Sequence, residues 1–451
     1  MRTQRRTRAA LAALSVAAVA VTTACQAESS TQSGGKAPVV VWASGGADAD
    51  LTKSFLDDVA KKNNITIDLK VIDSGNLNKQ LPLALRTGQG PDVFSPNNLA
   101  ALEDAGYLHP LGDVISEGTK KDLKTAYQSP SQFVHDGQLL AVPTNVGNIA
   151  LVYNKDLFRK AGLDPEKPPT TFSEVQQDAK TITEKVEGAY GYGLPLKFNG
   201  VVNWMIDPLI VNATTNLTQE GLYNVDTHKF EFEKYQPVVS LMRTMQKQGT
   251  TYPGASSLDI DALRAAFGQG KIGMYVDQTA AGPELDVTLK SKVDWGIANT
   301  PVPDGQQLKQ QIVHVGGAWA MNKNVKDLKD ATTVLEALLS PEFATMKAKA
   351  GFDVPASAAA AQADLSGGAS AHLPLFVVKS GGLQRPAPNF PSDDLNIKGD
   401  DWRAGVGKLL ANDADPAAAL SDLTAKYDEA LQQAVSAKKL TLSDYGYPPA
   451  S

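Results

Sequence analysis

Residues 137–154 read GQLLAVPTNVGNIALVYN, and this stretch decides how the chain is divided. Two apolar runs, residues 139–142 and 149–153, flank a short polar break. Apolar runs of this length, bounded by Gly and Pro, are typical of buried strands. The pattern fits a crossover, in which the chain leaves one sheet, enters another and turns Thr144, Asn145 and Gly147 toward a cleft. It also fits an ordinary hairpin within one sheet.

The segment before this stretch predicts a parallel sheet. Residues 38–42 (PVVVW) form a predicted strand, residues 50–63 place apolar side chains on one helical face, and residues 65–71 alternate as a second strand. Strand, turn, helix and strand in this order make a βαβ unit, whose ligand edge lies at the carboxyl ends of the strands. Three small residues follow the first strand and are either ligand contacts or a plain turn: Ser44, Gly45 and Gly46.

Two amides follow the next predicted strand. The segment GPDVFSPNN places Asn97 and Asn98 between the strand PDVF and a predicted helix. Asn is a favoured residue at the N-cap of a helix. We therefore expect these side chains to cap the helix, to hydrogen-bond a polar ligand from the strand end, or to do both.

Two tryptophans stand in contexts that invite a functional interpretation. Residues 312–322 (IVHVGGAWAMN) interrupt a predicted strand with Gly316 and Gly317, and glycines inside a strand weaken it unless a ligand or another backbone comes close. Together with Trp319, which we expect to be exposed, they form a candidate site. Trp204, in the apolar segment NGVVNWMIDPL, is either a core residue or a platform on which a ligand stacks.

The composition describes a globular protein with ample core. The chain has 451 residues, of which 42% are hydrophobic and 20% charged, and this length predicts two or three domains. The formal net charge of −6 argues against nucleic acid as a partner. The five histidines lack metal-ligand spacing, and neither a GxSxG nucleophile motif nor a phosphate-binding P-loop occurs. We therefore expect no metal and no cofactor.

The N-terminus has the layout of an export signal. Residues 1–24 carry four arginines and then an apolar run at 9–21, which is short of the roughly 20 residues that span a bilayer. Cys25, the only cysteine, follows small residues as in a bacterial lipobox, so it is either a lipidated anchor or incidental to a plain signal peptide. Residues 26–37 are rich in Ser, Gly and Gln and predict a flexible tether.

Several motifs in order give the mature chain a family resemblance. They are GPDVF with LEDAGYLHPL, GQLLAVPTNVGNIALVYNKDLFRKAGLDPEKPPTTFSE, AFGQGKIGMYVDQ, PVPDGQQ with GGAWAMNKN, and LLSPEFATMKAKAG. In this order the sequence resembles the extracellular solute-binding proteins of bacterial ABC importers, in particular the family 1 group that includes the maltose-binding protein. The resemblance covers nearly all of the chain after the tether.

The resemblance implies an α/β fold of two lobes, each discontinuous in sequence, joined by a hinge of crossing segments. Projected here, the first lobe comprises residues 38–145 with about 300–347, and the second comprises residues 146–299 with about 348–451. The crossings fall near residues 144–148, 299–301 and 345–355. A ligand that contacts both lobes would hold them closed.

The resemblance also implies a set of ligand positions. Carried over residue by residue, they fall on Ser44, Gly45, Gly46, Asn97, Asn98, residues 145–147 with Asn145 and Gly147, Asp277, Gln278, Gly316, Gly317 and Trp319. We add Trp204, Trp319 and Trp402 as candidate stacking groups. Gly147 stands where the maltose-binding protein has a carboxylate, so maltose itself is not the expected ligand. Amides, one carboxylate and tryptophans still suit a sugar, because hydroxyls take hydrogen bonds while a C–H face stacks on aromatic rings.

We therefore expect an exported, monomeric receptor that captures a mono- or oligosaccharide and presents it to a membrane permease with a cytoplasmic ATPase. Lipid on Cys25 would hold the receptor at the outer face of the cell membrane. Three other functions stay open: a secreted carbohydrate-active enzyme that needs one acidic residue, Asp277, for turnover, a binding protein for a non-sugar solute, and a sensor that reports to a signalling partner.

Overall fold

The computed structural model describes residues 36–46, 48–96, 98–128, 133–135, 137–363, 368–370, 372, 384–386, 389–392 and 394–446. Two candidates, Cys25 and Asn97, lie outside the described residues. The chain divides into Met1–Ala37 and a compact unit, Pro38–Ser451, which holds every described helix and strand. Among the described residues, none of the helices has the length and apolar character needed to cross a membrane.

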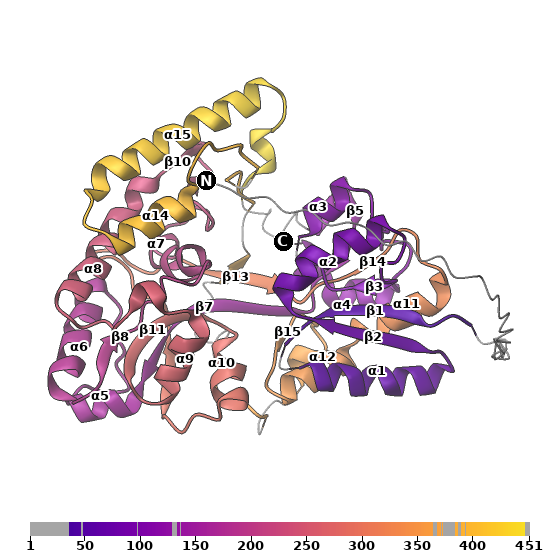
Figure 1. Ribbon diagram of the computed structural model, residues 1–451, viewed down its shortest axis with the longest axis horizontal. Coiled ribbons are helices and arrows are strands. Elements are labelled where there is room, and N and C mark those ends of the chain that lie inside the picture. Colours follow the sequence, from indigo (N-terminus) through magenta and orange to yellow (C-terminus); the bar gives the residue numbers. More distant parts are fainter. Residues whose placement is uncertain are drawn as a thin grey trace, which may run out of the picture. The chain divides into compact units, whose positions relative to one another are not determined.

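The first sheet joins segments from both ends of the sequence (Figure 1). Its five strands are, in order, β2 (Ile67–Ile72), β1 (Val39–Ser44), β3 (Val93–Phe94), β14 (Trp319–Met321) and β6 (Ala141–Val142). β1 pairs in parallel with β2 and β3, whereas β14 runs antiparallel to β3 and β6. The predicted βαβ unit is confirmed, because helix α1 (Ala49–Asn63) connects the parallel strands β1 and β2.

Helices cover both faces of this sheet. Successive side chains of β1 point to opposite faces and are apolar on each, so both faces need a covering layer. Val41 packs in one apolar cluster with Phe55 of α1 and Phe343 of α12, and Trp42 packs in another with Leu81 of α2. The helices around this sheet are α1, α2 (Ser74–Arg86), α3 (Leu99–Asp104), α4 (Glu117–Gln128), α11 (Leu328–Leu338) and α12 (Pro341–Lys349). A small hairpin, β4 (Val134–His135) with β5 (Gln138–Leu139), precedes β6.

The second sheet is organised around one long strand, β7. Its main path is β16 (Gln384–Pro386), β13 (Gln311–Gly316), β7 (Asn145–Asn154), β11 (Ile272–Gln278) and β8 (Tyr190–Tyr192). β12 (Trp295–Ala298) and β15 (Val354–Pro355) also pair with β7. The first residues of β7 pair with β13 and β15, and the rest pair with β11 and β12.

The crossover interpretation of residues 137–154 is confirmed. A hairpin would pair β6 with β7, but β6 pairs with β14 in the first sheet while β7 lies in the second. The passage between sheets is therefore Pro143 and Thr144. Figure 1 shows β7 extending from the helices of one lobe toward those of the other.

The second lobe packs its helices into one large apolar cluster with β7 and β11. The α-helices are α5 (Lys155–Ala161), α6 (Phe172–Lys185), α7 (Pro208–Val211), α8 (Gln236–Lys247), α9 (Ile260–Gly268), α10 (Ala281–Pro283), α14 (Trp402–Ala411) and α15 (Pro416–Ser436). A capping box of Thr171 and Glu174 starts α6. Trp402 is fully buried in this cluster, so the expectation that it stacks on a ligand is wrong.

Short elements complete the structure. In the part of the chain that the structure describes, the π-helices are η1 (Val201–Ile206) and η4 (Glu284–Thr288). The 3₁₀-helices of the same residues are η2 (Phe232–Tyr235), η3 (Ala255–Ser257), η5 (Ala360–Gln362) and η6 (Leu442–Asp444). A two-stranded ribbon joins β9 (Tyr223–Asn224) and β10 (Lys229–Phe230).

The second passage between sheets differs from the expected one near residues 299–301. Those residues stay in the second lobe, because Asn212 Nδ2 donates to Thr300 Oγ1 at 2.8 Å and the Val302 amide donates to the Thr170 carbonyl at 3.0 Å. β13 also belongs to the second sheet. The chain therefore returns to the first sheet between Gly316 and Trp319, where Gly317 has a positive φ of 59° that favours glycine.

Candidate functional site

Two adjoining cavities lie beside the passages between the two sheets. The β13 cavity, of about 270 Å³, and the β1 cavity, of about 320 Å³, share five lining residues: Asn145, Ala280, Pro283, Phe352 and Asp353. The other lining residues come from the ends of β1, β7, β11 and β13, from the helices α1, α9, α12, η1 and η4, and from the segments beside them. We call the two cavities together the cleft, and its walls come from both sheets.

Most of the predicted site residues lie in the cleft. The β1 cavity is lined by Ser44, Gly45, Gly46, Gly317 and Trp319, the β13 cavity by Gly147, Trp204, Gln278 and Gly316, and both by Asn145. Residues that are far apart in the sequence are thus brought together. Among the described residues, no cluster of His, Cys, Asp or Glu is placed to hold a metal ion.

Asn98 lies elsewhere. Its side-chain oxygen accepts a hydrogen bond from the Ala101 amide at 3.2 Å, so the capping interpretation is confirmed. The side chain lines a separate hollow beside Leu77 and Leu81 of α2. It is therefore placed to begin α3, and it does not contribute to the cleft.

Asp277 lies behind the cleft rather than in its lining. Its two carboxylate oxygens each accept a hydrogen bond of 2.9 Å from Arg264, whose side chain does line the β1 cavity. Asp277 is only 2% exposed, and one of its oxygens also accepts from the Gln278 amide at 2.8 Å. A bidentate pair of this kind fixes both side chains, so the carboxylate positions Arg264.

A second ion cluster ties the ends of three segments together. Lys347 of α12 contacts Asp48, which precedes α1, at 2.8 Å, and it also contacts Asp353. Burial lowers the pKa of Lys347, but the two carboxylates outweigh that effect and the net pKa is raised. Asp353 in turn accepts a hydrogen bond of 3.0 Å from Asn145 Nδ2. The cluster therefore holds the start of β7 and the segment before β15 against the first lobe.

Position 147 has to be glycine because the Thr279 side chain lies too close for a Cβ atom. A Cβ atom at this position would lie 2.2 Å from Thr279 Oγ1 and 2.8 Å from Thr279 Cβ. The Thr279 hydroxyl accepts from the Asn148 amide at 3.0 Å, which holds it there. Thr279 therefore occupies the space that a side chain at position 147 would need, and it lines the β13 cavity.

The two candidate tryptophans differ in exposure. Trp319 is 7% exposed and packs in the apolar cluster of the first lobe, so the expectation of an exposed side chain is wrong. It keeps one edge on the β1 cavity. Trp204 is half-buried in the π-helix η1, and its ring packs edge-on against His314, with 4.9 Å between centroids.

A buried polar network stands behind Trp204 and His314. Gln219 bridges His314 and the Asn203 carbonyl, while Asn203 Nδ2 donates to Glu220 at 3.0 Å. Arg403 of α14 completes the chain with an ion pair of 2.6 Å to Glu220. Nearby, burial raises the pKa of Asp207 to about 7, although a hydrogen bond from Tyr235 opposes the shift.

Several cleft residues were not among those indicated by the sequence. They are Asp48, Arg264, Thr279, Glu284, His314, Lys347, Phe352 and Asp353. A signal existed only for Lys347, Phe352 and Asp353, because they fall in the crossing expected at 345–355. The others depend on pairing between distant segments and have no local pattern.

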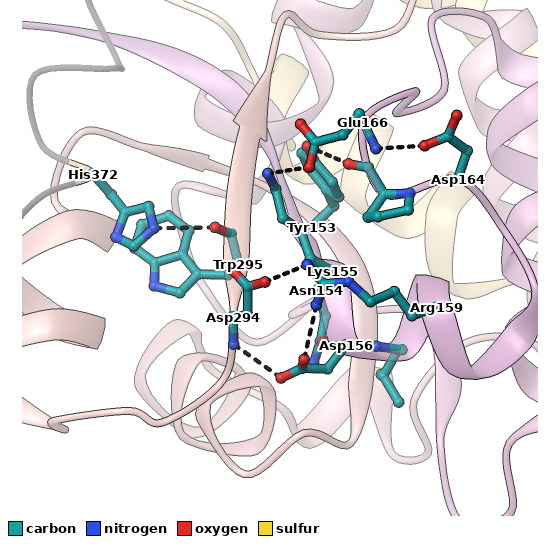
Figure 2. Close-up of polar contacts among 12 residues, drawn as sticks. Tyr153, Asn154, Lys155, Asp156, Arg159, Asp164, Glu166, Asp294, Trp295 and His372 are labelled. Atoms are coloured by element: carbon teal, nitrogen blue, oxygen red, sulfur yellow. Dashed lines mark hydrogen bonds and ion pairs between the residues drawn. The ribbon is translucent and has the colours of Figure 1, made fainter.

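A larger hollow, of about 1060 Å³, lies within the second lobe and contains none of the predicted site residues. It is lined by residues 166–178 and 297–308. Figure 2 shows contacts beside this hollow, including the ion pair of 2.9 Å between Lys155 and Glu166, a residue of its lining. Its lining comes from one lobe, so a ligand there would not bridge the two sheets.

Comparisons with known proteins agree on one family. A family profile described as bacterial extracellular solute-binding protein matches residues 43–345. A Brucella abortus (strain 2308) protein described only as a binding protein is 25% identical over 289 residues, which are 63% of this chain and 67% of that protein. The sn-glycerol-3-phosphate-binding periplasmic protein of Agrobacterium fabrum is 27% identical over 283 residues, or 60% of this chain and 61% of that protein.

Solved structures share the fold at low identity. An ABC transporter solute-binding protein of Thermotoga lettingae, bound to α-D-tagatose, has a TM-score of 0.70 and 18% identity and covers 88% of this chain and 100% of its own. The GacH receptor of Streptomyces glaucescens, solved without ligand and with acarbose, has a TM-score of 0.68 and 18% identity, with 88% and 99% covered. These likenesses establish a two-lobed α/β fold.

Proposed function

The chain belongs to the family of bacterial extracellular solute-binding proteins, and on this premise we propose that it captures a mono- or oligosaccharide in the cleft. Closure of the two lobes on the sugar would present it to the membrane permease of an ABC importer. The protein acts in this scheme as a receptor without chemistry of its own. Its two lobes are those expected from the family resemblance. The second passage between them lies at Gly316–Trp319 instead of near residues 299–301.

One observation favours a neutral ligand over a phosphate ester. Among the side chains that the structure describes, the permanently cationic ones that line the cleft are Arg264 and Lys347, and both are paired with carboxylates. A phosphate group needs unpaired cations or a cluster of backbone amides. The remaining lining includes hydroxyls, amides, the Glu284 carboxylate and two tryptophans, and these groups suit the hydroxyl groups and C–H faces of a sugar.

The test is a ligand screen by thermal unfolding, with D-tagatose, raffinose, maltotriose, xylo-oligosaccharides and sn-glycerol 3-phosphate. We expect at least one saccharide to raise the melting temperature, because a ligand at 100 times its dissociation constant adds about 2.7 kcal/mol of stability. sn-Glycerol 3-phosphate is expected to leave the melting temperature unchanged. Stabilisation by the phosphate ester, and by none of the sugars, would contradict the proposed ligand class.

We further propose that the protein is exported and anchored by acyl chains on Cys25, with residues 26–37 as a tether. The support is the sequence pattern together with the extracellular family. Labelled palmitate should enter the wild-type protein in a bacterial host and should not enter Cys25→Ala. Equal labelling of the two forms would exclude this anchor.

A further inference from the structure

His314 is a cleft residue that nothing in the sequence pattern singled out. It lies on β13 directly opposite Gly147 of β7, so its neighbour across the ladder has no side chain. Its imidazole lines the β13 cavity and packs against Trp204. The ring is therefore held in a cavity wall beside a candidate stacking group.

The partners of Gln219 determine which nitrogen of His314 carries the proton. Gln219 Nε2 donates to the Asn203 carbonyl, which can only accept, so the amide oxygen of Gln219 must face the histidine. That oxygen lies 2.9 Å from His314 Nε2. An amide oxygen accepts, and Nε2 therefore carries the hydrogen.

The other ring nitrogen, Nδ1, is then a bare acceptor. Burial lowers the pKa of His314 to about 4, so the ring is neutral near pH 7. None of the described residues hydrogen-bonds Nδ1. This nitrogen is also not one of the fully buried polar atoms without a hydrogen-bond partner, so it is not sealed off from the cavity. A lone pair thus remains accessible in the cavity wall.

We propose that Nδ1 of His314 accepts a hydrogen bond from a hydroxyl of the bound ligand, which makes His314 a specificity-determining residue of the cleft. This inference rests on the proposed function and deepens it. A neutral acceptor beside a tryptophan edge selects a ligand that presents a hydroxyl donor next to an apolar C–H face. A ligand group that can only accept would face the lone pair and be rejected.

Two substitutions separate this role from a structural one. His314→Gln places an amide near the Nε2 position, where it can still donate to Gln219, but leaves no acceptor at the Nδ1 position. His314→Asn places an amide oxygen near the Nδ1 position and gives up the contact with Gln219. With the saccharide of the panel above that binds the wild-type chain most tightly, calorimetry should show about tenfold weaker binding for His314→Gln. His314→Asn should bind within about threefold of wild type.

A second measurement does not need the ligand. Long-range ¹H–¹⁵N spectra of the ligand-free chain at pH 7 should show His314 protonated at Nε2 only, and added saccharide should shift the Nδ1 signal. A proton on Nδ1 would overturn the inference, as would unchanged affinity in His314→Gln or equal losses in the two variants. If none of the saccharides binds the wild-type chain, the proposed function fails and this inference fails with it. If they bind and His314→Gln binds equally well, only the inference about His314 fails.

Discussion

Gly147 and Thr279 form a complementary pair in which one residue occupies the space that the other leaves free. The threonine is stiff because it is β-branched, and its hydroxyl is bonded to the Asn148 backbone. The neighbour therefore cannot move aside easily. The pair shapes one wall of the β13 cavity.

Gly147→Ala should lower the free energy of unfolding by about 1 to 3 kcal/mol, because the new methyl group overpacks against Thr279. Urea denaturation measures this change. Gly112→Ala is the matched control, since nothing lies within 4 Å of a Cβ at that position, and it should have little effect. Equal free energies of unfolding for the two variants would show that Thr279 can move aside to make room for the methyl group.

His314 predicts a pH dependence of stability. Its folded pKa, about 4, lies below its usual value of 6.5, so the unfolded chain binds more protons between these pH values. Stability is therefore lost as pH falls from about 6.5 to 4. His314→Gln removes this contribution. As the pH falls from about 6.5 to 4, the melting temperature of the variant should therefore decrease less than that of the wild-type protein. A constant difference between pH 7 and pH 4 would contradict the lowered pKa.

At the scale of elements, α12 is connected to the hinge through Lys347. This lysine joins the segment before α1 and the segment before β15, and Asn145 at the start of β7 is bonded to the same carboxylate. One loop within the first lobe and two segments that enter or leave that lobe thus meet at one ion cluster. The arrangement fixes where the crossing strands begin.

Lys347→Met should cost about 2 to 4 kcal/mol of unfolding free energy, because it leaves Asp48 and Asp353 unpaired and largely buried. The cost is below that of a fully buried pair because water still reaches the carboxylates. Lys53→Met is the control, since its pair with Asp57 is exposed and surface pairs contribute at most about 1 kcal/mol. Chemical denaturation of both variants distinguishes the two cases. Similar losses of unfolding free energy in the two variants would mean that the Lys347 ion pairs contribute no more than an exposed surface pair.

The sequence was most informative about elements with a clear period. The βαβ unit could be predicted, because apolar periodicity and turn residues are local signals. The crossover before β7 could be predicted only with the help of the family resemblance, since the local pattern also fitted a hairpin. The passage expected near residues 299–301 could not be placed, because the Pro301 turn looks the same within a lobe as between lobes. Arg264 and His314 could not be assigned either, since their roles depend on partners in other strands.

At the scale of the whole molecule, the cleft walls come from two sheets that share few connections. A sugar held between them would gain contacts from both lobes only when the lobes are close together. Small-angle X-ray scattering should therefore show a smaller radius of gyration with saturating saccharide. sn-Glycerol 3-phosphate at the same concentration serves as the control and should leave the radius unchanged. A radius that does not change on sugar binding would mean that capture occurs without closure.

The segment that follows the family match contributes to the core of the second lobe. The match ends at residue 345, yet α14 and α15 supply much of the apolar core of the second lobe. Arg403 of α14 also holds Glu220, which accepts from Asn203, whose carbonyl orients Gln219. A substitution at Arg403 can thus alter the polarity of the cavity without touching any residue that lines it. Ligand preference can therefore change from behind the binding surface, through a helix that lies beyond the family match, without any change at the hinge.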